Sequence, residues 1–288
     1  GYSMVARAAT PHASRWRRAL VYACLAAGAL IAAVPFIWMA LASVMTRSET
    51  LRRLFFPSEI MWDNYRLAWE EADFGLYFQN SLIVAVLTVT GTLLLSLLAA
   101  YPLARMRFAG CDLVFAGILA TMMIPETVTM VPNFLTITWI HQLSPIPWLD
   151  SWPALTIPFM ASAFCIFLLR QFLRGLPVDL WDAARIDGAG HVRFLFQIVL
   201  PLCRAPLLTV GMFTFIGSWN ALAWPLLVTY TPTWRPIAVG LQQFVNEAGA
   251  EVHLQMAGAV IATMPVLALY FLIQREFTEG ISMSGMKG

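Results

Sequence analysis

The chain has 288 residues, of which 59% are hydrophobic and only 12% are charged. Soluble domains carry about 25% charged residues, so this composition excludes an ordinary soluble protein and indicates one that lies in a membrane. A formal net charge of +2 gives no electrostatic support for a nucleic-acid partner.

Long stretches without Asp, Glu, Lys or Arg predict the membrane spans, because a helix needs about 20 mostly apolar residues to cross the hydrocarbon core. Such stretches run over residues 19–46, 74–104, 151–169, 205–234 and 252–274, and a further one over 113–149 is interrupted only by Glu126. The first stretch is too long for the apolar part of a signal peptide. We therefore expect an all-α membrane protein with six transmembrane helices in a single transmembrane domain, residues 19–275.

The distribution of basic residues predicts the orientation, since cytoplasmic loops of membrane proteins carry an excess of Lys and Arg. With a cytoplasmic N-terminus, the 13 basic residues of the inner segments are Arg7, Arg15, Arg17, Arg18, Arg105, Arg107, Arg170, Arg174, Arg185, Arg193, Arg204, Arg275 and Lys287. The 5 basic residues of the outer segments are Arg47, Arg52, Arg53, Arg66 and Arg235. We therefore expect both termini in the cytoplasm, as an N-terminal segment, 1–18, and a C-terminal tail, 276–288.

Glu126 is the one acidic residue inside a predicted span, where a charged side chain costs about 2.5–3.5 kcal/mol on insertion scales. Counted from the start of its stretch, it lies toward the outer side, flanked by Pro125 and Pro132. It is a candidate for contact with a ligand or with an external partner. The alternative is a carboxylate that is solvated at a broken helix end.

A charged interruption, LWDAARIDGAGHVRFLFQIVLP at residues 180–201, separates the fourth and fifth spans on the predicted cytoplasmic side. Pro177 suits the first position of a helix of about 11 residues. Asp182 suits the early turns of that helix, and Gly188 suits a left-handed cap at its end. A second helix begins at His191. The sequence therefore predicts a rigid helix–turn–helix on the cytoplasmic surface.

This helix–turn–helix has the composition of a partner interface. Ala183 and Ala184 are small enough to let another chain approach, and Trp181 offers a large apolar anchor beside them. The alternative is an amphipathic loop that lies on the lipid head groups.

The spacing of these residues resembles the Glu-Ala-Ala loop of the permeases of binding-protein-dependent ATP-binding-cassette (ABC) importers. That motif is Glu-Ala-Ala, three residues, Gly, nine residues and Ile-x-Leu-Pro. Here Asp182, Ala183 and Ala184 are followed at the same spacings by Gly188 and by Ile198, Val199, Leu200 and Pro201. The fragments AARIDGAG, NSLIVAVLTV, LAAYPLARMRFAG, SWNALAWPLLV and GISMSGMKG extend the resemblance from about residue 64 to the end. Together they are similar to the carbohydrate-uptake subfamily, and specifically to its smaller, maltose-type permease.

The resemblance implies a subunit without an ATPase site of its own, one of two non-identical permeases in the cytoplasmic (inner) membrane of a bacterium. Its partners would be the second permease, two ATPase subunits that hold ATP and Mg, and an extracytoplasmic solute-binding protein. This chain would bind no cofactor and would form half of the pathway for a sugar or related solute. The sequence itself contains no GxxxxGK[ST] phosphate loop.

The resemblance also implies that residues 177–200, hereafter the docking loop, contact the ATPase. The docking residues, including one just beyond the loop, would be Trp181, Asp182, Ala183, Ala184, Gly188, Ile198, Leu200 and Pro201. The end of the tail, Ser284 to Gly288, would touch the same partner. Asp182 is one methylene shorter than the family's Glu, so a salt bridge made by that Glu does not transfer to this chain.

Two further features are candidates for contacts along the pathway. In GSWNALAWP, residues 217–225, Trp219, Asn220 and Trp224 either face the pathway, where indole rings stack on sugars, or form an interhelical hydrogen bond with packing aromatics. In the maltose type the other permease supplies most substrate contacts. The outer loop 230–252, with Trp234 and Arg235, is a candidate contact for the binding protein.

Other functions remain as alternatives. The imported solute could be glycerol phosphate, a glycerophosphodiester or a sugar phosphate, although no span interior has an arginine to bind a phosphate. An ion-coupled secondary transporter is more distant, because such proteins show intramembrane acids and inverted repeats. A membrane enzyme or a metal site would need a cluster such as HExxH, which the sequence lacks, and its four cysteines form no CxxC pair.

Overall fold

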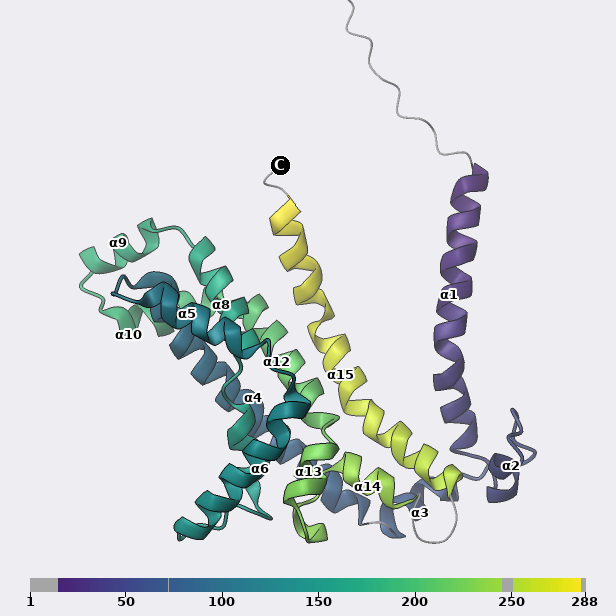
Figure 1. Ribbon diagram of the computed structural model, residues 1–288. Coiled ribbons are helices and arrows are strands. Elements are labelled where there is room, and N and C mark those ends of the chain that lie inside the picture. The colour runs from purple at the N-terminus through teal and green to yellow at the C-terminus, as the bar shows by residue number, and fades with distance from the viewer. Residues whose placement is uncertain (1–14, 72, 245–250, 286–288) are drawn as a thin grey trace, which may run out of the picture.

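The computed structural model describes residues 15–71, 73–244 and 251–285, which form helices and no β-strand (Figure 1). The first half contains α1 (Arg15–Ala42), α2 (Arg47–Leu51), α3 (Asp63–Glu71), α4 (Phe74–Arg105), α5 (Cys111–Thr121), α6 (Glu126–Leu143), α7 (Trp152–Thr156) and the 3₁₀ turn Ile157–Phe159. The second half contains α8 (Ala163–Gly175), α9 (Asp179–Ile186), α10 (His191–Phe194), the π-helical turn Leu195–Val199, α11 (Leu200–Leu202), α12 (Arg204–Trp219), α13 (Ala223–Val228), the 3₁₀ turn Pro232–Trp234, α14 (Ile237–Gln243) and α15 (Val252–Gly285). The all-helical prediction is confirmed for the described residues.

Three segments are long and apolar enough to cross a membrane as single helices: Arg18–Ala42, Phe74–Arg105 and Val252–Gln274. Three further candidates are helix pairs bent at a short break, namely Cys111–Thr121 with Glu126–Leu143 (99°), Trp152–Phe159 with Ala163–Gly175 (43°), and His191–Leu202 with Arg204–Trp219 (80°). The part of the chain that the structure describes therefore holds three helices long and apolar enough to span a membrane, or up to six such spans if each bent pair counts as one.

Three of the predicted stretches are not single helices. The stretch 151–169 is divided between α7 with its 3₁₀ turn and α8. The stretch 113–149 is interrupted between α5 and α6, where Pro125 directly precedes the first residue of α6. The stretch 205–234 is interrupted after α12, and Pro225 lies in the short helix α13 that follows. Proline has no backbone N–H and its ring crowds the preceding turn, so it favours such breaks. A stretch without charges therefore indicates burial in lipid but not where its helix is broken.

α4 runs through the centre of the molecule and contributes to each of the three buried apolar clusters. In its second half, Leu97 and Tyr101 pack with residues of α8, the docking loop and α12. In its first half, Ala85 packs with residues of α3, α12, α14 and α15, and Val84 packs with residues of α6, α7 and α13. A shift of α4 would therefore change the packing of all three clusters.

One face of α4 carries small polar residues four positions apart. Thr88, Thr92 and Ser96 are at most 1% exposed, and their spacing places them on one side of the helix. Short side chains allow neighbouring helices to come close, which fits the extensive contacts of α4 with α8 and α12. Thr92 donates a hydrogen bond to the carbonyl oxygen of Phe159 at 3.2 Å, which ties α4 to the turn before α8.

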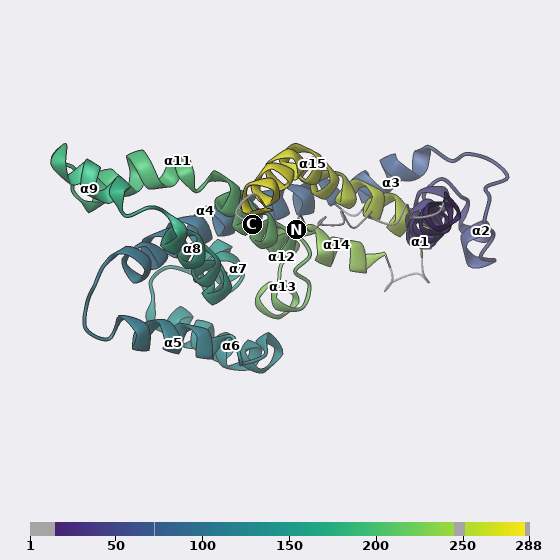
Figure 2. The same cartoon turned by 90° about the horizontal axis from the view of Figure 1, so that it is seen from above.

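The docking loop, the start of α1 and the end of α15 lie toward one end of the molecule, and α2, α3 and α14 lie toward the other (Figure 1). α1 stands apart from the helices around α4 and contacts α15 (Figures 1 and 2). The expected tail, 276–288, is not separate from the last span, because α15 continues to Gly285. The first 14 residues of the expected N-terminal segment and the last three residues of the tail lie outside the described residues.

Candidate docking element and candidate pathway cavity

The first helix of the docking loop is shorter than the sequence predicts. α9 has 8 residues and begins at Asp179, so the prediction that Pro177 opens the helix was wrong. The reason is Arg105, the last residue of α4. Its guanidinium donates hydrogen bonds to the carbonyl oxygens of Leu176 at 2.8 Å and Pro177 at 3.0 Å. These carbonyls are thereby engaged outside the helix, and the docking loop is fastened to the end of α4.

Gly188 ends α9 in the left-handed conformation that the sequence predicts, with φ +76°. Its N–H donates to the carbonyl of Arg185 at 3.0 Å, and the next N–H, of Ala189, donates to the carbonyl of Ala184 at 2.8 Å. A Cβ added to Gly188 would meet no atom within 4 Å. Backbone conformation, and not crowding, therefore requires glycine at this turn.

An aromatic cluster fastens the docking loop to α4 a second time. Trp181 stacks on His191 with ring centroids 4.3 Å apart and meets Phe194 edge-on at 5.0 Å. His191 Nδ1 and the hydroxyl of Tyr101 on α4 are hydrogen-bonded at 2.8 Å. Trp181 is thus half-buried within its own loop, and the contact of its indole with another chain stays a prediction.

The side chain of Ala184 does not face a partner either. It is only 4% exposed and belongs to the same cluster as Phe194, whereas Asp182 and Ala183 are exposed. The idea that both alanines leave room for another chain therefore holds only for Ala183. Ile198 and Leu200, at the end of the motif, also pack against this cluster, and only Pro201 is exposed. Half of the eight predicted docking residues therefore pack within the loop and hold its shape.

The exposed apolar surface of the docking loop comes from residues that the sequence analysis missed. Val178, Ile186 and Val192 are 63%, 87% and 71% exposed. A signal for Ile186 was present in the spacing of α9. Because Trp181 and Ala184, three positions apart, face inward, Ile186 falls on the outer face. An apolar side chain on the outer face of a charged helix is a better candidate for a partner contact than the buried Ala184.

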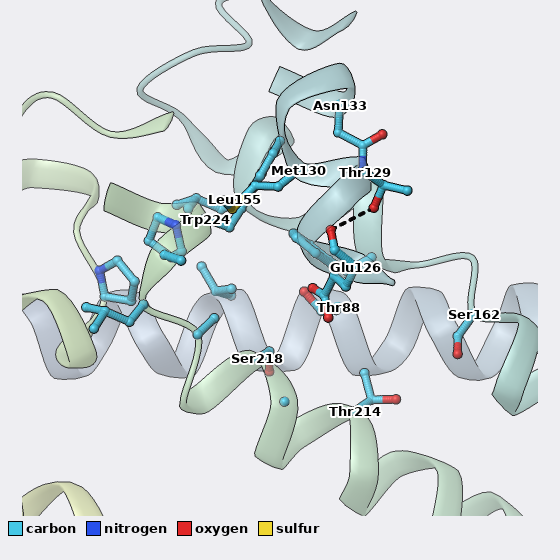
Figure 3. Close-up of a pocket in the computed structure, with 18 of the residues that line it drawn as sticks. Thr88, Glu126, Thr129, Met130, Asn133, Leu155, Ser162, Thr214, Ser218 and Trp224 are labelled. Atoms are coloured by element: carbon cyan, nitrogen blue, oxygen red, sulfur yellow. Dashed lines mark hydrogen bonds between the residues drawn. The ribbon is translucent and has the colours of Figure 1, made fainter. Parts of the chain in front are cut away.

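A cavity of about 570 Å³ lies between α4, α6, α8, α12 and α13 (Figure 3). Its polar lining residues are Thr88, Glu126, Thr127, Thr129, Asn133, Ser162, Thr214 and Ser218, and its larger apolar ones include Met130, Leu155, Phe159, Phe164, Phe213 and Trp224. Of the four residues predicted for a pathway, the structure brings Glu126 and Trp224 to this cavity, and Trp219 and Asn220 are not among its lining residues.

Glu126 occupies the first position of α6, directly after the 99° bend from α5. The two alternatives for this residue are therefore not exclusive, because it lies both at a broken helix end and on the wall of the cavity. The N-terminal end of a helix favours a negative charge, which accounts for an acidic residue in an otherwise apolar stretch.

The tryptophan and amide side chains of 217–225 have separate roles. Trp219 is 2% exposed and donates from Nε1 to the carbonyl of Ala262 on α15 at 3.0 Å, so it is a packing residue between helices. Asn220 donates to Ile216 of its own helix at 3.0 Å. Trp224 donates to Ala154 at 2.8 Å while lining the cavity. The interhelical hydrogen bond expected of Asn220 is made by Trp219 instead.

The loops at the end opposite the docking loop are fastened to one another through Asp150. Its carboxylate accepts from the N–H of Tyr230 at 2.9 Å and from the N–H and hydroxyl of Thr231 at 3.1 and 2.7 Å. Burial alone would raise the pKa of Asp150, but these hydrogen bonds and the charge of Arg235 hold that pKa below its ordinary value. Trp234, a candidate external contact, packs edge-on against Trp152 at 4.9 Å. Part of the predicted contact loop, 245–250, lies outside the described residues.

Comparisons with known proteins agree on one family. The family described as binding-protein-dependent transport system inner membrane component matches residues 92–282. An sn-glycerol-3-phosphate transport system permease of Yersinia enterocolitica is 35% identical over 233 residues, covering 78% of this chain and 81% of the relative. A diacetylchitobiose uptake system permease of Streptomyces coelicolor is 32% identical over 283 residues, covering 96% and 91%.

The fold has a solved counterpart as well. The crystal structure of a bacterial ABC transporter involved in the import of the acidic polysaccharide alginate matches with a TM-score of 0.80 at 24% identity, covering 92% of this chain and 99% of that chain. The chain belongs to the binding-protein-dependent transport system inner membrane components, as a permease of the carbohydrate-uptake ABC importers.

Proposed function

We propose that this chain forms half of the translocation pathway of an importer for a sugar or related polyol, with the docking loop seated on a partner ATPase. The observation that carries the proposal is the position of α4. This helix is fastened to the docking loop through Arg105 and Tyr101 and lines the cavity through Val84 and Thr88. A movement imposed on the loop by ATP binding is thereby passed to the cavity along one continuous helix.

The proposal also includes the other parts of the importer. A second, non-identical permease supplies the opposite wall of the pathway, two ATPase subunits hold ATP and Mg, and a solute-binding protein docks on the end that holds Asp150 and Trp234. The chain binds no cofactor of its own. Six spans form when each bent pair crosses the membrane once. Glycerol phosphate is the second candidate solute, because the permease from Yersinia enterocolitica is named for it.

The proposed orientation places both termini and the docking loop in the cytoplasm, in keeping with the common end that the start of α1, the end of α15 and the docking loop occupy in Figure 1. In a chain without its native cysteines, we expect a single cysteine at Ser144 to react with a membrane-impermeant thiol reagent added to intact cells. A single cysteine at Gly190 should react only after the cells are opened. Labelling of the cysteine at Gly190 in intact cells would mean that the docking loop lies outside the cytoplasm and that the proposed orientation is wrong.

Binding of the ATPase to the docking loop can be tested at Ile186, which is 87% exposed. A charge introduced at the centre of an interface removes a hot-spot contact, so Ile186→Glu should lower the amount of ATPase that copurifies with the permease pair by about tenfold or more. The control is Ile60→Glu, since Ile60 is also exposed, at 57%, but precedes α3 at the other end of the molecule. Normal copurification of Ile186→Glu would remove the docking loop from the interface and favour a loop that lies on the lipid surface.

A further inference from the structure

The wall of the cavity carries a negative charge and hydroxyl groups but no positive charge. Among the residues that line it, Glu126 brings a carboxylate, and none is Arg, Lys or His. Phosphate and carboxylate ligands are recognised through charge-assisted hydrogen bonds from Arg and Lys, which this wall does not offer. The chemistry of the wall therefore distinguishes between the two classes of solute that the family leaves open.

No ion pair or side-chain hydrogen bond joins the carboxylate of Glu126 to another described residue. The ion pairs of Arg66 with Asp63 and Glu70, and of Arg170 with Asp112, do not include Glu126. Its place at the start of α6 lets the helix dipole stabilise the negative charge without a cation. Both carboxylate oxygens can therefore accept hydrogen bonds from a solute.

Thr88 supplies a second polar group to the same cavity (Figure 3). It is 1% exposed, and its hydroxyl has no hydrogen-bond partner among the described residues. Buried hydroxyl groups in proteins nearly always have a partner, so an unpaired one on a cavity wall marks a position for a ligand atom. Because Thr88 lies on α4, this position also belongs to the helix that is fastened to the docking loop.

We propose that Glu126 and Thr88 form a charge-selective subsite, which accepts uncharged polyhydroxylated solutes and rejects solutes that carry a phosphate. Hydroxyl groups of the solute donate to the carboxylate in strong, charge-assisted hydrogen bonds. Trp224 and Phe159 give apolar surface to the C–H faces of a sugar ring. A phosphate would instead meet a like charge on the cavity wall, which repels it. The inference rests on the proposed function, because such a subsite selects solutes only if it lies on the transport path.

The test uses the full importer in lipid vesicles, with the four native cysteines replaced by alanine and Asn133→Cys placed on the cavity wall. A cationic and an anionic methanethiosulfonate of similar size probe the local charge. We expect the cationic reagent to react faster, and Glu126→Gln to lower the ratio of the two rates by about threefold or more. Glu59→Gln, the same change on an exposed loop residue outside the cavity, should leave the ratio unchanged.

A second arm measures protection of the same cysteine by a matched pair of solutes, glucose and glucose 6-phosphate, at equal high concentration. Glucose should slow the reaction with a neutral thiol reagent, and glucose 6-phosphate should not. Thr88→Val, which removes the hydroxyl at constant shape, should weaken protection by glucose, and Thr88→Ser should retain it. Equal protection by both sugars, or protection by neither, would overturn the subsite. So would a ratio of cationic to anionic reaction rates that is the same with and without Glu126→Gln.

A different set of labelling results would contradict the proposed function itself. If the cysteine at position 133 reacts with neither charged reagent, or reacts at one rate with and without bound nucleotide, the cavity is not on the transport path. In that case both the proposed pathway and the subsite are wrong. If its reactivity depends on nucleotide but not on the charge at Glu126, the pathway stands and only the subsite is wrong.

Discussion

Gly188→Val is expected to abolish transport while the permease pair still inserts at normal levels. A β-branched residue with φ near the +76° of Gly188 is strained by about 1–3 kcal/mol, so the turn relaxes to another conformation and α10 is re-aimed relative to α9. The cluster of Trp181, His191 and Tyr101 depends on that angle, since it joins the two helices to α4. ATP hydrolysis should then no longer respond to loaded binding protein, which is measured in vesicles.

The matched control for this variant is Gly190→Ala, two residues away. Gly190 has φ −82° and ψ 173°, an extended conformation that any residue adopts, and an added Cβ would meet no atom within 4 Å. It should therefore transport normally. The transport rate of Gly188→Asn should lie between those of Gly188→Val and Gly190→Ala, because asparagine tolerates the left-handed region better than valine. Wild-type transport by Gly188→Val would mean that the angle between α9 and α10 is not used in coupling.

Arg105→Met is expected to uncouple the ATPase from the pathway and to lower transport by about tenfold or more. The methionine keeps much of the apolar stem but donates no hydrogen bond, so the carbonyls of Leu176 and Pro177 lose their link to α4. Arg105→Lys should retain partial activity, because the donors of a lysine lie on one nitrogen and cannot reach both carbonyls as the planar guanidinium does. ATPase subunits should still copurify, since the exposed face of α9 is unchanged.

Arg107→Met separates this effect from a mere loss of positive charge on the cytoplasmic side. Arg107 is exposed and lies two residues beyond Arg105. It should transport at the wild-type rate. If Arg105→Met and Arg107→Met behave alike, the contacts of Arg105 with the docking loop do not carry the coupling.

The docking loop could be predicted from the sequence to a large extent, because its signals are local. The spacing from Asp182 to Pro201 matches a family motif, and Gly188 adopts the left-handed conformation that its place at a helix end indicates. What the spacing does not contain is the direction in which each side chain faces. Ala184 was expected to face a partner and instead packs inward, since the contacts of Arg105 and Tyr101 set the rotation of the loop.

The cavity was predictable only in part, because it is built from segments far apart in the chain. Glu126 is conspicuous as an acid in an apolar stretch, and it does line the cavity. Thr88 is an ordinary residue in the stretch 74–104, and only its four-residue spacing from Thr92 and Ser96 indicates a polar face. Trp219 and Trp224 are alike in sequence, yet only Trp224 reaches the cavity, because α12 ends at Trp219 and a separate helix begins at Ala223.

The central claim is that α4 carries movement of the docking loop to the cavity, and one measurement tests it most directly. In the assembled importer, a cysteine at Asn133 is labelled in the nucleotide-free state and in the state trapped with ATP and vanadate, with Arg105 or with Arg105→Met. With Arg105, the labelling rate should differ severalfold between the two states. With Arg105→Met and the ATPases still bound, the two rates should be equal. An undiminished difference in Arg105→Met would contradict transmission through the end of α4.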